Sequence, residues 1–144
     1  MGNLFVTYKQ AFDLKELGFD VPCFSYIYNG DTGNNVDHYV EVVPSKSQNY
    51  NTDLLCISTP LKSQVFQWFR DTHKIFPEIL TDCTTEPKFC YTYTRFFGNP
   101  NDLASEEWGW ENTIGQYSLL YRTYPEAESE CIDKLIEIIR SEQK

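Results

Sequence analysis

The ten residues Lys88–Phe97 constrain the fold of this chain more than any other stretch, because their side chains alternate strictly between two sets. One set holds four aromatic rings and an arginine, and the other holds a cysteine, two threonines and a phenylalanine. A period of two residues is typical of a strand in an antiparallel sheet, whose two faces meet different surroundings. We therefore predict a long strand here, which residues 84–87 connect to a preceding strand over residues 78–83.

Three other segments predict helices. Residues 7–17 begin with the capping box Thr-Tyr-Lys-Gln and end before a glycine, which can close a helix in the left-handed conformation. Residues 59–74 begin with a threonine and a proline, an order that favours a helix start, and carry an apolar stripe that includes Trp68. Residues 123–140 begin with a second capping box, Thr-Tyr-Pro-Glu, and repeat apolar side chains at helical spacing.

The remaining apolar or alternating runs predict strands over residues 23–28, 37–43, 54–58 and 114–122. The first two flank a reversal rich in asparagine and glycine, which predicts a hairpin, and the polar residues 44–53 predict an exposed loop. This order of elements predicts an α+β fold, a mostly antiparallel sheet of about five to six strands with three helices packed on it. At 144 residues, the chain fits a single domain over residues 1–144.

The charge balance excludes one class of partner. The chain has 12 Lys and Arg against 21 Asp and Glu, a formal net charge of −9. A surface this acidic repels phosphate backbones, so we expect no binding to nucleic acid. No run of about 18 apolar residues and no basic, apolar leader is present, so we also expect no membrane partner and a cytoplasmic location.

The cysteines are five in number and scattered, at Cys23, Cys56, Cys83, Cys90 and Cys131. Their spacing contains no CxxC pair and no zinc-site pattern. Most lie in apolar runs, where a free thiol packs as a small hydrophobic group. We predict reduced, structural thiols and no bound metal.

Acid–base chemistry has few places in this sequence, because the only histidines are His38 and His73. A catalytic histidine needs an orienting partner and a nucleophile, and no motif supplies them. We therefore predict no catalytic residue and no cofactor. One alternative stays open, an enzyme of unknown class in which His73 or His38 meets a cysteine or a carboxylate in space, for example His73 with Cys56 or Cys83.

Aromatic residues make up 16% of the chain, with ten Tyr, ten Phe and three Trp. Packing of a small core accounts for many of these rings. Trp108 and Trp110 differ, because they lie in the expected loop 98–112 between Glu107 and Glu111. Rigid rings with one wet edge are enriched in recognition surfaces, so we predict that these four residues form an exposed binding element.

Three separated stretches resemble a group of short, uncharacterised proteins of Bacteroidetes-type bacteria and their phages. They are residues 14–20 with 22–23, residues 59–61 leading to 68–70, and residues 124–127 before the last helix. The resemblance covers about half of the chain and implies a phage or prophage context. It implies no activity and no catalytic residue.

These observations predict a small non-enzymatic interaction protein that binds another protein or associates with itself as a homo-oligomer. The acidic balance leaves a second hypothesis open, an inhibitor that mimics the charge of nucleic acid against a basic, nucleic-acid-binding or defence protein of a host. Carboxylates clustered on one face at phosphate-like spacing would favour that inhibitor.

Overall fold

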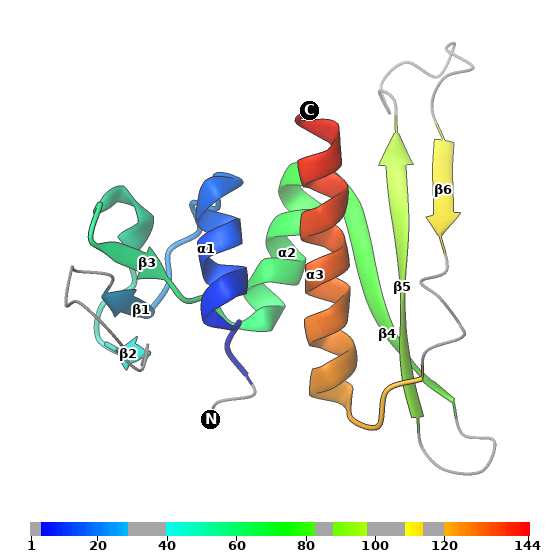
Figure 1. Ribbon diagram of the computed structural model, residues 1–144, viewed down its shortest axis with the longest axis horizontal. Helices are drawn as coiled ribbons and strands as arrows, with labels where there is room; N and C mark the ends of the chain where they lie inside the picture. The colour runs from blue at the N-terminus through cyan, green and yellow to red at the C-terminus, as the bar shows by residue number, and fades with distance from the viewer. Residues whose placement is uncertain (1–3, 29–39, 83–87, 98–108, 114–119) are drawn as a thin grey trace. The chain divides into compact units, whose positions relative to one another are not determined.

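The computed structural model describes residues 4–28, 40–82, 88–97, 109–113 and 120–144. Its elements, in chain order, are α1 (Tyr8–Glu16), β1 (Ser25–Tyr28), β2 (Glu41–Val42), the 3₁₀ turn η1 (Tyr50–Thr52), β3 (Cys56–Ser58), α2 (Lys62–His73), β4 (Ile75–Asp82), β5 (Lys88–Phe97), β6 (Gly109–Thr113) and α3 (Tyr124–Glu142). The α+β class and its three helices are confirmed (Figure 1).

The strands form two antiparallel sheets, with the orders β2-β1-β3 and β4-β5-β6 (Figure 1). The expected single sheet of five to six strands is therefore wrong. At β3, the carbonyl of Cys56 and the amide of Ser58 bond to the side chains of Lys15 and Asn51. These backbone groups are not available to a further strand, which closes the first sheet at this edge.

The chain divides into two compact units, residues 1–65 with 132–144 and residues 66–131. Helices α2 and α3 each contribute residues to both units. The single domain over residues 1–144 stays a prediction.

In the first unit, α1 has the predicted start and end. The Oγ1 of Thr7 accepts from the amide of Gln10 at 3.2 Å, and the Gln10 side chain accepts from the Thr7 amide at 3.0 Å. Gly18 has a φ of +87°, a conformation that glycine adopts without strain. The chain then folds back, so that the Phe19 amide donates to the Leu14 carbonyl at 2.9 Å and the Phe19 ring is buried.

The predicted hairpin is confirmed where the structure describes it, because β1 pairs with β2 antiparallel. The predicted strand over residues 54–58 is shorter than expected, since β3 starts at Cys56. The predicted exposed loop over residues 44–53 is wrong at Tyr50, which is buried at the start of η1.

Helix α2 begins two residues later than the Thr-Pro pair predicts. The carbonyl of Pro60 accepts from the Val6 amide, and Leu61 forms a β-bridge with Phe5. This pairing with a distant segment holds the chain extended, and the helix starts only where the Gln64 side chain accepts from the Leu61 amide at 3.0 Å.

In the second unit, β5 has the predicted bounds and pairs with β4 on one side and β6 on the other. Strand β4 starts earlier than expected and contains Pro77. A proline lacks the amide donor of a ladder, and an edge strand tolerates this loss. The second capping box is also confirmed, with the Thr123 and Glu126 side chains each accepting from the other's amide.

Two further expectations for this unit need correction. The predicted loop over residues 98–112 ends in β6, and the predicted strand over residues 114–122 is wrong at its described end, where Tyr121 makes only an isolated bridge with Phe89. Residues 114–119 lie outside the described part of the chain. Residues 109–113 form a strand because they pair with β5, and this pairing outweighs their local preference for a loop.

Candidate functional site

The four residues predicted as a binding element fall into two groups. Trp108 and Glu107 lie outside the described residues. Trp110 and Glu111 lie in β6, where their backbone pairs with β5 instead of forming the expected loop. The binding role of all four stays a prediction.

A different surface of the first unit brings aromatic and acidic side chains together. Opposite residues on antiparallel strands share a face, so Tyr28 lies with Cys56, and Tyr26 lies with both Ser58 and Glu41. We call these five residues the tyrosine face. The other face of the same sheet carries the buried side chains of the core, among them Ile27 and Ile57.

One ring of the tyrosine face, Tyr26, is held by a stacking neighbour, and the other, Tyr28, is exposed. Tyr26 stacks on Tyr50, with ring centroids 4.5 Å apart and planes inclined by 28°. The Tyr50 amide donates to the Ser58 hydroxyl at 3.0 Å, which ties η1 to β3. The side chain of Tyr28 is 56% exposed, so one ring of this face is open to solvent.

Beside the tyrosine face, residues 53–56 form a tight turn that we call the leucine turn. The Asp53 carboxylate accepts from the Leu55 amide at 2.8 Å, and the Asp53 carbonyl accepts from the Cys56 amide at 3.4 Å. Leu54 is 93% exposed and Leu55 is 47% exposed. The prediction that both leucines belong to a buried strand is wrong, because Asp53 draws the chain into a turn just before β3.

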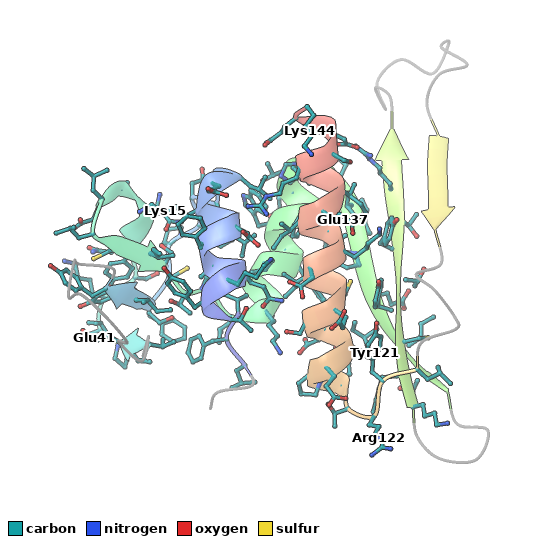
Figure 2. All side chains as sticks on the ribbon, viewed as in Figure 1. Lys15, Glu41, Tyr121, Arg122, Glu137 and Lys144 are labelled. Atoms are coloured by element: carbon teal, nitrogen blue, oxygen red, sulfur yellow. The ribbon has the colours of Figure 1, made fainter. Side chains whose placement is uncertain are left out.

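Helix α1 holds the leucine turn in place through a single side chain. The Lys15 ammonium donates to the carbonyl of Asp53 at 2.9 Å and to the carbonyl of Cys56 at 2.7 Å. Figure 2 labels Lys15 and Glu41, which mark the helix and the sheet of this region. Asn51 adds a second support, accepting from the Ser58 amide at 2.9 Å and donating to the Phe19 carbonyl at 2.8 Å.

Carboxylates shape the electrostatics of the tyrosine face. A hydrogen bond to the Glu41 carboxylate raises the pKa of the Tyr26 hydroxyl. Burial raises the pKa of the Cys56 thiol, and the negative charges of Asp53 and Glu41 raise it further, against the opposing charge of Lys15. The carboxylates of Asp53 and Glu41 therefore both act on Cys56, which pairs with Tyr28 across strands β3 and β1.

A polar groove of about 450 Å³ also lies in the first unit, between α1 and the end of α3. Two of its acidic groups are bonded to neighbours: Asp13 to Lys9 at 2.9 Å and to Arg140 at 2.7 Å, and Asp133 to the Gln10 side-chain amide at 3.0 Å. The groove also holds Glu137, Ser141, Ile136 and Lys144. Acidic and basic side chains both line this groove, and Arg140 of α3 bonds to Asp13 of α1. The groove therefore does not present the cluster of carboxylates that a charge mimic needs.

The histidine and cysteine predictions are tested only in part. The His73 ring packs against Trp68, with centroids 4.7 Å apart, and against Phe69, at 5.7 Å. His38 and Cys83 lie outside the described residues. The four cysteines that the structure describes are not joined in disulfides, and burial raises the pKa of Cys23 and of Cys131 to about 12.

No group of three or more histidine, cysteine or acidic side chains in the described segments is placed to hold a metal ion. Among the helices described, none has the length and apolar character needed to cross a membrane.

Comparisons with known proteins leave the function to be argued from this geometry. No family model, curated protein or solved structure matches the chain.

Proposed function

We propose that this chain is a non-enzymatic interaction module that binds another protein through the leucine turn and the tyrosine face. One observation carries the proposal: Leu54 is 93% exposed at the tip of a turn that Lys15 holds from a neighbouring helix. A leucine on a well-supported turn differs from one on a loose loop, because its position is set before a partner arrives.

Energetics support this role. Burying a leucine side chain is worth about 1.5–3 kcal/mol, and Leu54 gains almost none of this in the isolated chain. Binding through a turn that is already ordered costs less conformational entropy than ordering a mobile segment. Tyr28 adds a rigid ring with two rotatable torsions, the type of side chain enriched at the centre of interfaces.

Three of the described thiols have raised pKa values, which do not favour a role as nucleophiles. A thiolate is the nucleophilic form of cysteine. With pKa values of about 12, Cys23 and Cys131 hold their protons near neutral pH. The pKa of the more exposed Cys56 is also raised, so this thiol is not activated either.

The experiment compares capture of partners from a lysate of the source organism by three forms of the immobilised chain. The wild-type chain and a Leu4→Ser control, altered at a residue 58% exposed outside the proposed surface, should retain the same specific protein. The double variant Leu54→Ser/Leu55→Ser should lose that protein while unfolding at the same urea concentration. Equal capture by all three forms would overturn the proposal.

Sedimentation of the purified chain tests the alternative of self-association. If the leucine turn joins two copies, the wild-type chain sediments as a dimer and the double serine variant as a monomer. We expect both to sediment as monomers, because two copies that each carry a net charge of −9 repel one another.

A further inference from the structure

Within the described residues, the tyrosine face and the leucine turn together carry two exposed carboxylates, and the strands β1, β2 and β3 contain no basic residue. Glu41 is exposed and lies opposite Tyr26, and Asp53 is exposed at the start of the leucine turn. The nearby ammonium of Lys15, which is bonded to two backbone carbonyls, offsets only one of these two charges. The local balance therefore has the same sign as the net charge of the whole chain.

The backbone of β3 restricts how a partner can bind. An added strand needs free amides and carbonyls along the sheet edge. The Cys56 carbonyl bonds to Lys15, the Cys56 amide to the Asp53 carbonyl, and the Ser58 amide to Asn51. A partner at this edge consequently meets the side chains of the face and not its backbone.

A second copy of this chain is a poor occupant, because it would bring the same carboxylates toward Glu41 and Asp53. Like charges placed together at an interface oppose association, whereas opposite potentials speed encounter and fix orientation. The complementary occupant is a cationic one. An exposed tyrosine ring on the same face as Glu41 suits such an occupant, since cations also bind over the faces of aromatic rings.

We propose that the occupant of the tyrosine face is a basic segment of the partner protein, with an arginine or lysine over the Tyr28 ring and paired with Glu41. This inference rests on the proposed function and names the chemistry of its partner. The carboxylate of Glu41 has acceptor sites beyond the bond to the Tyr26 hydroxyl, so it can take both interactions.

A pair of synthetic peptides provides the probe. One has eight residues with three arginines and two leucines among serines, and the other replaces the arginines with glutamates. Titrations are followed by NMR through the backbone amides of Tyr28 and Cys56. Tyr28→Ala and Glu41→Gln test the surface, and Glu137→Gln is the matched control, because its exposed carboxylate pairs with Lys134 on α3.

We expect the arginine peptide to shift the amides of Tyr28 and Cys56 and the glutamate peptide to leave them unchanged. Tyr28→Ala and Glu41→Gln should each weaken binding by about fivefold, the scale of an exposed cation–π contact or ion pair, while Glu137→Gln has no effect. Raising the salt from 0.05 to about 0.5 M should weaken binding further, because exposed charges are screened. No binding of the arginine peptide, or equal binding of both peptides, overturns the inference.

The captured partner separates this inference from the proposed function. If the partner needs Leu54 and Leu55 but is indifferent to Glu41→Gln and to salt, the basic occupant is wrong and the interaction module stands. If the double serine variant still captures it, the interaction surface itself is wrong, whatever the peptides do.

Discussion

The two sheets of this protein are held together by different kinds of hydrogen bond. In the second unit, β4, β5 and β6 have 8, 10 and 5 residues, and their backbone ladders suffice to define the sheet. In the first unit, β1, β2 and β3 have only 4, 2 and 3 residues. Hydrogen bonds from side chains to the backbone add to these short ladders. They come from Lys15, from Asn51 and from the Ser25 hydroxyl, which donates to the Thr59 carbonyl.

This difference connects structure to function. A sheet completed by side chains has its edge bonds occupied and its turn supported, so its exposed residues are held without a long hydrogen-bonded strand. The first sheet can therefore present two leucines on a turn whose backbone is held in place, next to a face with an exposed tyrosine. We expect its stability to depend on a few named side chains, whereas the stability of the second sheet is spread along the backbone.

The largest expected effect is the pH dependence of stability, which arises from a buried thiol in each unit. Burial raises the pKa of Cys23 in the first unit and Cys131 in the second to about 12, from an ordinary 9.0. A raised pKa means that the folded state favours the neutral thiol, so this stabilisation is complete below pH 9 and is lost as the pH rises toward 12. Each pKa unit corresponds to about 1.4 kcal/mol.

Urea unfolding between pH 8 and 11 checks this expectation. Relative to the wild-type chain, Cys23→Ala and Cys131→Ala should each flatten the decline in the free energy of unfolding. A decline that neither variant changes would show that these thiols do not titrate with the fold.

The next largest effect is the loss of stability when a buried isoleucine of either sheet is shortened to alanine. Ile57 in β3 and Ile75 in β4 are both fully buried, and each change to alanine should cost about 3 kcal/mol in the free energy of unfolding. Hydrogen exchange should separate them. We expect Ile57→Ala to abolish amide protection throughout β1 and β3, and Ile75→Ala to leave most protection in β5. The same loss in both sheets would remove the distinction between them.

A smaller effect tests the side-chain support of the short sheet. Asn51→Ala removes the bonds to the Phe19 carbonyl and the Ser58 amide, which together should cost about 2 kcal/mol. Asn51→Asp keeps an acceptor for Ser58 and loses the donor to Phe19, so it should cost about half as much. Thermal unfolding measures both, and equal costs would mean that the Ser58 bond contributes nothing.

The smallest effect concerns the leucine turn itself. Leu54→Ser should change the free energy of unfolding by less than about 0.5 kcal/mol, because the side chain makes little contact with its own chain. Urea unfolding gives this value directly. A loss of 2 kcal/mol or more would place Leu54 in the core and end its role as a free contact.

Local rules account for the parts of the fold that the sequence predicts. The capping boxes at Thr7 and Thr123 depend on residues three positions apart, and both form as expected. The prediction of the strand Lys88–Phe97 also depends on neighbouring residues only, because it uses the alternation of consecutive side chains. These elements can be predicted without information on tertiary contacts.

Distant partners explain the parts that the sequence does not predict. Pro60 is held extended by the segment around Val6, and Lys15 reaches carbonyls 38 and 41 residues away in the chain. The leucine turn had one local signal, Asp53 directly before Leu54, since aspartate favours the first position of a turn. The apolar run 54–57 outweighed it in the prediction of a buried strand.

The expected phage context, cytoplasmic location and inhibitor role stay predictions, as does the binding element at Trp108 and Trp110. Within the described residues, the evidence for an interaction surface lies in the first unit instead. Trp108→Ala and Trp110→Ala, measured beside Leu54→Ser in the same capture assay, would show whether the two surfaces act together.

Photo-crosslinking from position 54 tests the central claim most directly. A photoreactive leucine analogue is placed at position 54, or at position 4 as the control, and each chain is irradiated in cells of the source organism. We predict one discrete crosslinked protein from position 54, absent from position 4 and reduced when Lys15→Met releases the turn. The same diffuse products from both positions would contradict the claim that the leucine turn is a protein-binding surface.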